Sequence, residues 1–345
     1  MNSQPARPRV QDVARIAGVA VGTVSNVLNH PTRVTPATRK RVQEAIDQLG
    51  FIRNDVARQL KAGTSKTLGL IVPDASNPFF AEVARGSEIE AQEADYSLLM
   101  GNSGQDVERE SKYFYLFQEQ RISGVLVSPI EDVREEIESM RSQGTQTVLV
   151  DRKADPSICC SVSVDDIAGG RMALQHLIDQ GYRNIIFVAG PLEIQQVADR
   201  LSGAREAIRQ SRGGAQLRVI TTKNLDVLDG REVGSQIVAM PPIERPDAVF
   251  AANDLLAVGV LQAFVFNASI KVPEEIGLVG YDDIAFAESA IVPLTSIKQP
   301  ARLLGKTGVE MLIEEIEDPS GHRHRQITFQ PALVVRESTT GPSAR

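Results

Sequence analysis

The sequence predicts a small all-α head followed by an α/β body of two doubly wound parallel-sheet lobes. Residues 12–28 hold two short amphipathic helices joined by a tight turn, and from about residue 67 short apolar runs alternate with helical stretches. Charge divides at the same boundary: residues 1–66 hold eleven Lys or Arg and four Asp or Glu, a net charge of +7, and the remainder carries −14. A length of 345 residues suits two or three domains.

The first helix of the head is predicted from the start of DVARIAGVAVGTVSNVL. Asp12 is expected to cap it, and Val13, Ile16 and Ala17 are expected to form its apolar face. Gly18 stands where the helix must stop and the chain reverse.

The second helix is expected to begin near Val21 and to turn Val24, Val27 and Leu28 inward. Its other face is small and polar and carries no acid, so it can approach DNA closely. Positive charge confined to the head is the expected footprint of phosphate contact. The alternative to DNA contact, for each polar residue, is a role in helix capping or simple exposure to solvent. This face holds Gly22, Thr23, Ser25, Asn26 and Asn29.

In the body, alternating strands and helices predict parallel sheets covered on both faces. Ligands bind such sheets beyond the carboxyl ends of the strands. The expected strands are TLGLIVPD, SLLMGN, GVLVSP and TVLVDR in one lobe, and NIIFVAG, LRVIT, AVFAAN and IGLVGYDD in the other. The helices between them are expected over 79–94, 106–119, 131–142, 168–180, 198–210, 229–239 and 254–266.

Polar side chains gather at these strand ends and suggest a sugar site. Carboxylates, amides and guanidinium groups form paired hydrogen bonds with neighbouring hydroxyls, and the rings of Phe79 and Phe80 offer flat apolar faces. One of the two rings is expected to be core instead. Asp282 is expected to contact ligand, and Asp283 to be structural. The polar candidates are Asn77, Asp151, Arg152, Arg200, Asn253, Asp282 and Gln299.

Composition argues against several other classes. No apolar run of 18 residues is present, and MNSQPARPRVQD lacks the apolar core of a signal peptide, so a cytoplasmic protein is expected rather than a periplasmic binding protein. Adjacent Cys159 and Cys160 are expected to be buried free thiols. No metal-ligand cluster is visible in the sequence, and neither metal nor cofactor is expected.

An enzyme is the competing class, because doubly wound folds host many enzymes. The stretch LLGKTG at 303–308 contains Gly-Lys-Thr, but a phosphate-binding P-loop needs glycine five residues before Gly305, where Pro300 stands. No GxSxG nucleophile elbow appears. The sequence therefore favours a regulator.

Over nearly its full length the chain resembles the LacI/GalR family of bacterial transcriptional regulators. The resemblance rests on DVARIAGVAVGTVSNVLN, RVTPATRKRVQEAIDQLGFIRNDVARQLK, LGLIVPDASNPFF, SVDDIAGGRMALQHLIDQGYRNIIFVAGP, ANDLLAVGVLQAF, VGYDD and TSIKQPARLLGKTGVEML, in order. It implies a third head helix over 36–49 with Thr35 as N-cap, a hinge helix, and a body similar to periplasmic sugar-binding proteins whose chain crosses three times between lobes. The implied parts are a disordered arm 1–9, a helix-turn-helix domain 10–53, a hinge 54–66, a first lobe 67–164 and 298–324, a second lobe 165–297 and 325–338, and a disordered tail 339–345.

For DNA, the resemblance implies that Val21, Gly22 and Asn26 read base edges. Asn26 can pair with adenine, although many relatives carry Arg here, so the operator sequence stays open. Phosphate contacts, which position without specifying sequence, are implied for Thr23, Ser25, Asn29, Thr35, Thr38 and Asn54.

The hinge helix, about 54–61, is too short and polar to be stable alone. The resemblance implies that it folds on DNA, pairs with its dimer mate through Val56 and Ala57, and drives Leu60 into the minor groove. Arg58 and Lys61 would face phosphate. The alternative is that Leu60 packs as linker core. A dimer reading a palindromic operator is favoured, since the end STTGPSAR has no leucine heptad.

The effector pocket also looks like that of ribose-binding proteins, with Leu225 where they have Phe. Purine-binding relatives carry Arg and Thr where this chain has Ile194 and Gln196, which argues against a free purine base. D-Ribose is therefore the favoured effector. Another monosaccharide, a nucleoside, a phosphosugar or a protein corepressor stays open, as does the sign of the effect on DNA binding.

Overall fold

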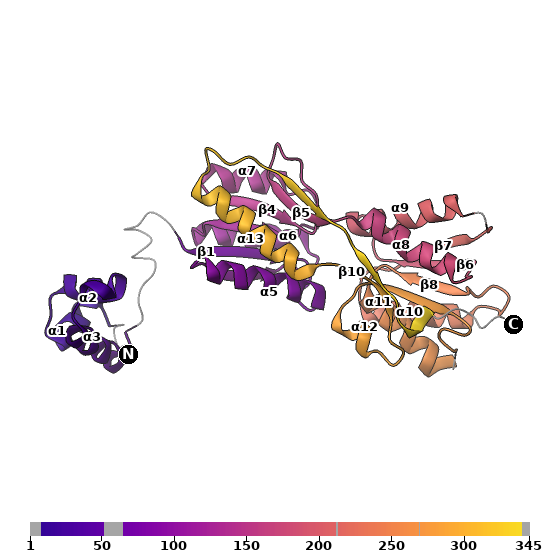
Figure 1. Cartoon of the computed structure of the whole chain (residues 1–345), viewed down its shortest axis with the longest axis horizontal. Helices are drawn as coiled ribbons and strands as arrows, with labels where there is room; N and C mark the ends of the chain where they lie inside the picture. The colour runs from indigo at the N-terminus through magenta and orange to yellow at the C-terminus, as the bar shows by residue number, and fades with distance from the viewer. Residues whose placement is uncertain (1–7, 52–64, 212, 269, 340–345) are drawn as a thin grey trace. The chain divides into compact units, whose positions relative to one another are not determined.

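The computed structural model describes residues 8–51, 65–211, 213–268 and 270–339. The chain divides into two compact units, 1–64 and 65–345 (Figure 1). The predicted hinge residues Asn54, Ala57, Arg58, Leu60 and Lys61 lie outside the described residues, as do most of the predicted arm and tail.

The head unit is a three-helix fold around a small apolar core. Helix α1 (Val10–Ala17) and helix α2 (Val21–Asn29) are joined by Gly18, whose φ of +62° is the left-handed conformation that glycine adopts without strain. A 3-10 turn, η1 (Pro31–Arg33), leads to helix α3 (Pro36–Leu49). Val13, Val24 and Val42 form the fully buried centre.

Two details of the first helix differ from the sequence prediction. The helix begins at Val10, so Asp12 lies inside its first turn and caps it from there, accepting a hydrogen bond from the Arg9 backbone N–H at 2.9 Å. Ile16 is exposed, and Ala14 takes its expected place in the core. The helix therefore buries a face shifted toward Ala14.

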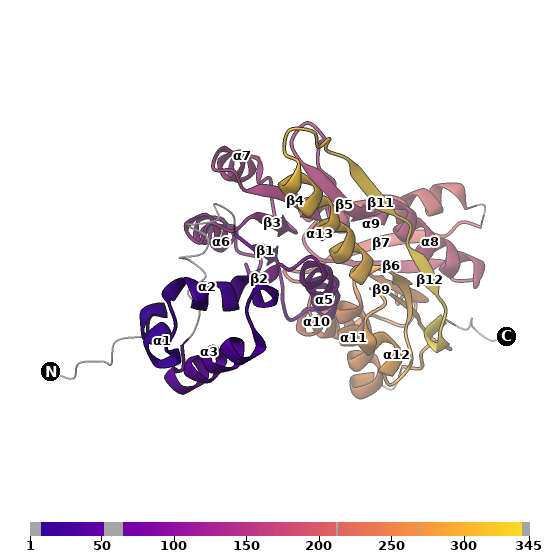
Figure 2. The ribbon, with the colours of Figure 1, turned by 60° about the vertical axis from the view of Figure 1, so that its left-hand side comes forward.

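The body holds two six-stranded sheets, one in each lobe (Figures 1 and 2). The first has the order β11-β5-β4-β3-β1-β2 and the second β12-β10-β9-β8-β6-β7. All neighbouring strands are parallel except β10 and β12. The strands are β1 (Thr67–Val72), β2 (Ser97–Asn102), β3 (Gly124–Val127), β4 (Gln146–Val150), β5 (Cys160–Val164), β6 (Asn184–Ala189), β7 (Gln216–Thr221), β8 (Ala248–Ala251), β9 (Gly277–Asp282), β10 (Thr295–Lys298), β11 (Gln326–Phe329) and β12 (Ala332–Val334).

Helices cover both faces of the first sheet. Leu68 and Leu70 of β1 pack in one apolar cluster with α5 (Pro78–Glu93) and α13 (Ala301–Glu317), which lie side by side in Figure 2. Ile71 of the same strand packs in a second cluster with α6 (Val107–Glu119) and α7 (Arg134–Ser142). Alternate side chains of a buried strand thus serve opposite faces.

The second sheet is enclosed by helix pairs α8 (Asp166–Asp179) with α9 (Gln195–Gln210), and α10 (Val227–Ala239) with α11 (Asp254–Ala263), which continues into the π-helical η2 (Phe264–Ala268). A short helix α12 (Ala285–Ser289) and a 3-10 turn η3 (Glu337–Thr339) complete the lobe. Helices α8 and α9 approach closely at Gly203, where an added Cβ would lie 1.9 Å from the Ile167 carbonyl oxygen.

The chain crosses between lobes three times, but the last crossing differs from the prediction. The segment 325–338 was expected to lie wholly in the second lobe. Instead it forms two strands: β11 pairs with β5 in the first sheet, and β12 pairs with β10 in the second. Thr339, assigned to a disordered tail, is buried and hydrogen-bonds His176 at 2.8 Å. Among the described residues, no helix is long and apolar enough to span a membrane.

Candidate functional site

The outer face of α2 presents the residues predicted to meet DNA. Val21, Gly22 and Asn26 are exposed, and Thr23 and Ser25 are half-buried. The helix carries no acidic residue. This face is therefore free to approach a polyanion without like-charge repulsion. Asn29 closes the helix.

Thr35 and Thr38 meet at the start of α3. The Thr35 Oγ1 accepts a hydrogen bond from the Thr38 backbone N–H at 3.4 Å and donates to the Thr38 Oγ1 at 3.0 Å. Both residues thus serve in capping the helix, as the sequence predicted for Thr35. A phosphate role for either one stays a prediction.

A cavity of about 380 Å³ lies between the two lobes of the body. This volume is at the lower end of the range for small-molecule sites. Residues at the carboxyl ends of strands in both lobes line it, as the doubly wound topology requires. Nine of the ten predicted effector residues line it: Asn77, Phe79, Phe80, Asp151, Arg200, Leu225, Asn253, Asp282 and Gln299.

Arg152 is the predicted residue that does not line the cavity. Its guanidinium donates to the carbonyl oxygens of Glu131 at 2.6 Å and Pro129 at 3.3 Å. The preceding Asp151 has a φ of +62°, which turns the chain at this point. Arg152 therefore holds a loop whose residues face the cavity, rather than facing it itself.

Arg200 is the buried cation of the site. Its Nε donates to Asp166 Oδ1 at 2.8 Å, one NH2 group donates to the Ala252 carbonyl at 2.7 Å, and the guanidinium stacks 3.7 Å from the Tyr281 ring centroid. Burial opposes its charge, but Asp166 and the other nearby acidic groups raise its pKa above the ordinary value. The guanidinium is fixed and charged.

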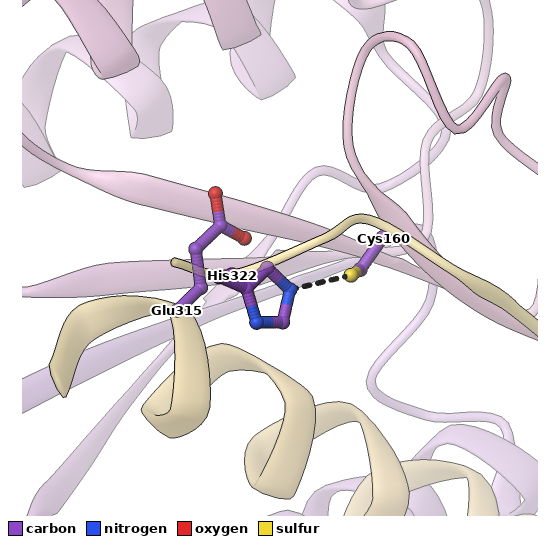
Figure 3. A group of neighbouring side chains, drawn as sticks. All are labelled: Cys160, Glu315 and His322. Atoms are coloured by element: carbon purple, nitrogen blue, oxygen red, sulfur yellow. Dashed lines mark hydrogen bonds between the residues drawn. The ribbon is translucent and has the colours of Figure 1, made fainter. Parts of the chain in front are cut away.

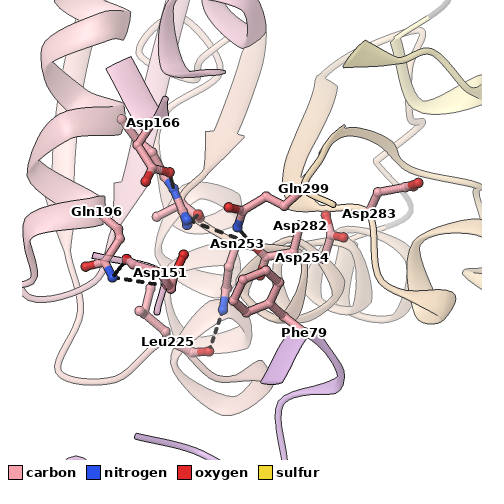
Figure 4. A network of polar contacts seen from close by, with 12 residues as sticks. Phe79, Asp151, Asp166, Gln196, Leu225, Asn253, Asp254, Asp282, Asp283 and Gln299 are labelled. Atoms are coloured by element: carbon pink, nitrogen blue, oxygen red, sulfur yellow. Dashed lines mark hydrogen bonds and ion pairs between the residues drawn. The ribbon is translucent and has the colours of Figure 1, made fainter. Parts of the chain in front are cut away.

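Asp282 and Asp151 face the cavity as buried carboxyl groups (Figure 4). Burial raises the pKa of Asp282 to about 6, against the lowering effect of Arg200 and of Gln299, whose Nε2 donates to Asp282 at 2.8 Å. Burial, with Asp166 nearby, also raises the pKa of Asp151 well above its usual value. Such perturbed groups in a cleft are typical of functional sites.

Two oxygens of the cavity lack a hydrogen-bond partner within the described part of the chain. These are Asp151 Oδ1 and Gln299 Oε1, and both are buried. A buried unpaired acceptor costs about 1–3 kcal/mol. A ligand that brings O–H or N–H donors to these two oxygens would recover that free energy.

The two asparagines of the cavity also hold local structure. Asn77 Oδ1 accepts from the Phe79 N–H and caps α5, and Asn253 Oδ1 accepts from the Leu256 N–H and caps α11. The Asn253 Nδ2 donates to the Leu225 carbonyl at 3.0 Å. Phe79 is core, as one ring was expected to be, and still contacts the cavity, where it meets Phe80 edge to face at 5.0 Å.

Sequence reasoning missed two residues that shape the site. Asp166 holds Arg200, and the Gln196 side chain donates to the Asp151 carboxylate at 3.1 Å (Figure 4). Asp166 begins α8 two residues after the end of β5, so its place near a strand end was an available signal. Asp283 lies outside the lining and pairs with Arg336 at 2.7 Å, a structural role as expected.

The sequence showed no metal-ligand cluster, but the fold brings one potential set of ligands together. Cys160, Glu315 and His322 meet in the first lobe. Both cysteines are free and buried, as expected.

The chain also resembles known proteins. A family model described as "Bacterial regulatory proteins, lacI family" matches residues 9–54, and one described as "Periplasmic binding protein-like domain" matches residues 174–339. The HTH-type transcriptional repressor PurR of Photobacterium profundum is 34% identical over 338 residues, which cover 95% of this chain and 98% of that protein.

The chain belongs to the LacI family. It is a DNA-binding transcriptional repressor controlled by an effector, and it is not an enzyme. Among solved structures, the lac repressor dimer bound to operator and the anti-inducer ONPF has a TM-score of 0.80 at 26% identity, covering 96% of this chain and 99% of that chain. A LacI family regulator from Enterococcus faecalis V583 with bound ribose has a TM-score of 0.72 at 29% identity, covering 81% and 100%.

Proposed function

We propose that this LacI-family repressor binds a small sugar, with D-ribose as the first choice, in the cavity between its lobes. The observation that carries the proposal is the pair of buried acceptors without donors, Asp151 Oδ1 and Gln299 Oε1. A sugar hydroxyl can donate to each of them. The fixed Arg200 guanidinium can donate to other ring oxygens, and Phe80 offers an apolar face.

Several features favour ribose within this class. The cavity of about 380 Å³ suits a single ring better than an oligosaccharide. The lining keeps the residues of the ribose-binding pattern except at Leu225, where ribose-binding proteins have Phe, and at Arg152, which does not line the cavity. A related regulator from Enterococcus faecalis was solved with ribose. Gln196 stands where purine-binding relatives carry Thr, and its side chain is committed to Asp151, which argues against a free purine base. Another monosaccharide is the second candidate, because the unpaired acceptors take any suitably placed hydroxyl.

On DNA, we propose a homodimer that reads a palindromic operator. Val21, Gly22 and Asn26 would face the bases, while Thr23, Ser25 and Asn29 would contact phosphates together with Thr35, Thr38 and Asn54. The hinge residues Ala57, Arg58, Leu60 and Lys61 would complete the interface, with Leu60 as a minor-groove wedge. The lac repressor, solved as a dimer on its operator, supports this arrangement. As a DNA-binding repressor, the protein is proposed to act in the cytoplasm.

Calorimetry tests the effector. The full chain is titrated with D-ribose, other pentoses, hexoses, nucleosides and a purine base. We expect saturable heat with ribose, and no heat in the Asp282→Asn variant. The neighbouring Asp283→Asn variant is the matched control, because Asp283 does not line the cavity. Saturable binding of a different ligand, with none for ribose, would overturn the choice of ribose.

A further inference from the structure

We propose that the first lobe binds a divalent metal ion of the zinc class through Cys160, Glu315 and His322. The three ligand atoms lie within 4.8 Å of one another, and His322 Nε2 is 3.1 Å from Cys160 Sγ (Figure 3). Thiolate, imidazole and carboxylate are the three side-chain ligands that Zn²⁺ takes in proteins. The site belongs to the first lobe's core and shares no residue with the cavity lining.

The geometry needs only small shifts to hold an ion. With Zn–S near 2.3 Å and Zn–N or Zn–O near 2.0–2.2 Å, the ligand atoms of a tetrahedral site lie about 3.4–3.6 Å apart. Cys160 and His322 would move apart by about half an ångström from their 3.1 Å hydrogen bond. The other ligand atoms start no farther apart than 4.8 Å and would have to approach to the same 3.4–3.6 Å, a movement of at most about 1.4 Å.

The carboxylate of Glu315 is the second observation that points to a cation. The residue is 4% exposed, and its Oε2 is buried with no hydrogen-bond partner among the residues that the structure describes. The other oxygen, Oε1, pairs with His324 Nε2 at 3.1 Å, and His324 Nδ1 lies 3.0 Å from the Pro156 carbonyl oxygen. Glu315 is thus oriented by an outer partner and has one free oxygen, the arrangement in which outer groups fix a metal-binding carboxylate.

The surroundings of the sulfur also suit a metal-bound thiolate. The Arg325 backbone N–H donates to Cys160 Sγ at 3.3 Å, and such a donor stabilises negative charge on sulfur. His322 is half-buried, so the site is open to solvent on one side, where an ion can enter and a water can fill the fourth position.

A bound ion would join three segments of the first lobe. Cys160 begins β5, Glu315 lies in the last turn of α13, and His322 lies in the connection from α13 to β11. This connection leads into β11, and β11 is followed by β12 in the sheet of the second lobe. We therefore expect the ion to stabilise the folded body by mass action.

Cobalt substitution tests the site in the untagged, reduced full chain. We expect one Co²⁺ per chain, with a thiolate-to-cobalt charge-transfer band and the visible d–d bands of tetrahedral Co²⁺, both displaced by Zn²⁺. Zn²⁺ should also raise the unfolding temperature in a concentration-dependent manner. Cys160→Ala should abolish the charge-transfer band, and His324→Gln should weaken Co²⁺ binding by about 10- to 100-fold.

The adjacent cysteine supplies the control. Cys159 packs in the apolar cluster on the opposite face of the sheet from Cys160, so Cys159→Ala should keep the charge-transfer band. If Cys160→Ala fails to fold, the half-buried His322→Gln serves instead, with an expected loss of Co²⁺ affinity of at least about tenfold. A wild-type chain without a charge-transfer band, or a band that survives in Cys160→Ala, would refute the site.

Discussion

Two ion pairs join helices α8 and α9, and they differ in burial. Arg200 pairs with Asp166 at 2.8 Å, with side chains that are 6% and 5% exposed. Arg171 pairs with Glu206 at 3.1 Å across the same two helices, with side chains that are 45% and 31% exposed. A buried pair loses about 3–5 kcal/mol when one partner is removed, whereas an exposed pair contributes about 0–1 kcal/mol.

The perturbation is Asp166→Asn. It leaves the Arg200 charge in a site where burial opposes that charge, but the new amide oxygen can still accept the hydrogen bond. We therefore expect the free energy of unfolding to fall by about 3 kcal/mol, the lower end of the range for a buried pair. Glu206→Gln is the matched control, with an expected loss below about 1 kcal/mol. Because Arg200 also lines the cavity, Asp166→Asn should weaken effector binding as well.

Urea unfolding followed by tyrosine fluorescence measures these changes in the body alone. The chain has no tryptophan, and its tyrosines are Tyr96, Tyr113, Tyr115, Tyr182 and Tyr281, all in the body unit. The head therefore contributes no signal to this transition. Equal losses of unfolding free energy in Asp166→Asn and Glu206→Gln would refute the reasoning that burial makes the Arg200–Asp166 pair the more stabilising of the two.

Three further predictions concern other parts of the molecule. Leu60→Ala should weaken operator binding by about tenfold, or about 1.4 kcal/mol, and reduce DNA bending in a circular-permutation gel assay. Unchanged affinity and bending would refute the insertion of Leu60 into the minor groove. The raised pKa of Asp282, about 6 against 3.8, favours the folded state below pH 3.8, and this stabilisation is lost as the pH rises through 6. As the pH rises from about 4 to about 7.5, the free energy of unfolding of Asp282→Asn, measured in urea, should therefore rise by about 3 kcal/mol relative to that of wild type. A difference between the two proteins that does not change with pH would contradict the assignment. Gly203→Ala should destabilise the body by about 1–3 kcal/mol, because its Cβ meets the Ile167 carbonyl; a neutral effect would show that α8 and α9 can separate freely.

Much of the cleft could be predicted because parallel strands place their carboxyl ends at one edge. Asp151, directly after β4, and Asp282, the last residue of β9, were expected to meet for this reason, and both line the cavity. Arg152 also follows β4 but does not line the cavity. Asp151 has a left-handed backbone conformation, and the Arg152 side chain after it donates to a loop carbonyl oxygen. The residue pattern encodes neither this turn nor the loop carbonyls that Arg152 meets.

Other features depend on contacts between distant parts of the chain. The segment ITFQPALVVRES, residues 327–338, is predicted as one last strand, but the structure interrupts the strand at 330–331 and pairs β11 with β5 in the first sheet and β12 with β10 in the second. Cys160 and His322 are 162 positions apart, so no spacing in the sequence could bring them together as ligands. In the head, Gly18 could be placed because its signal is local, and Thr35 was placed by the family resemblance.

The central claim is that occupation of the cavity by a sugar controls DNA binding. The most direct test measures operator affinity of the full chain with and without saturating D-ribose, in wild type and in Asp282→Asn. We expect ribose to change the wild-type operator affinity by about 5- to 150-fold, the usual range of coupling between two sites, and to leave the affinity of Asp282→Asn unchanged. An operator affinity that ribose leaves unchanged in wild type, or changes equally in both proteins, would contradict the claim.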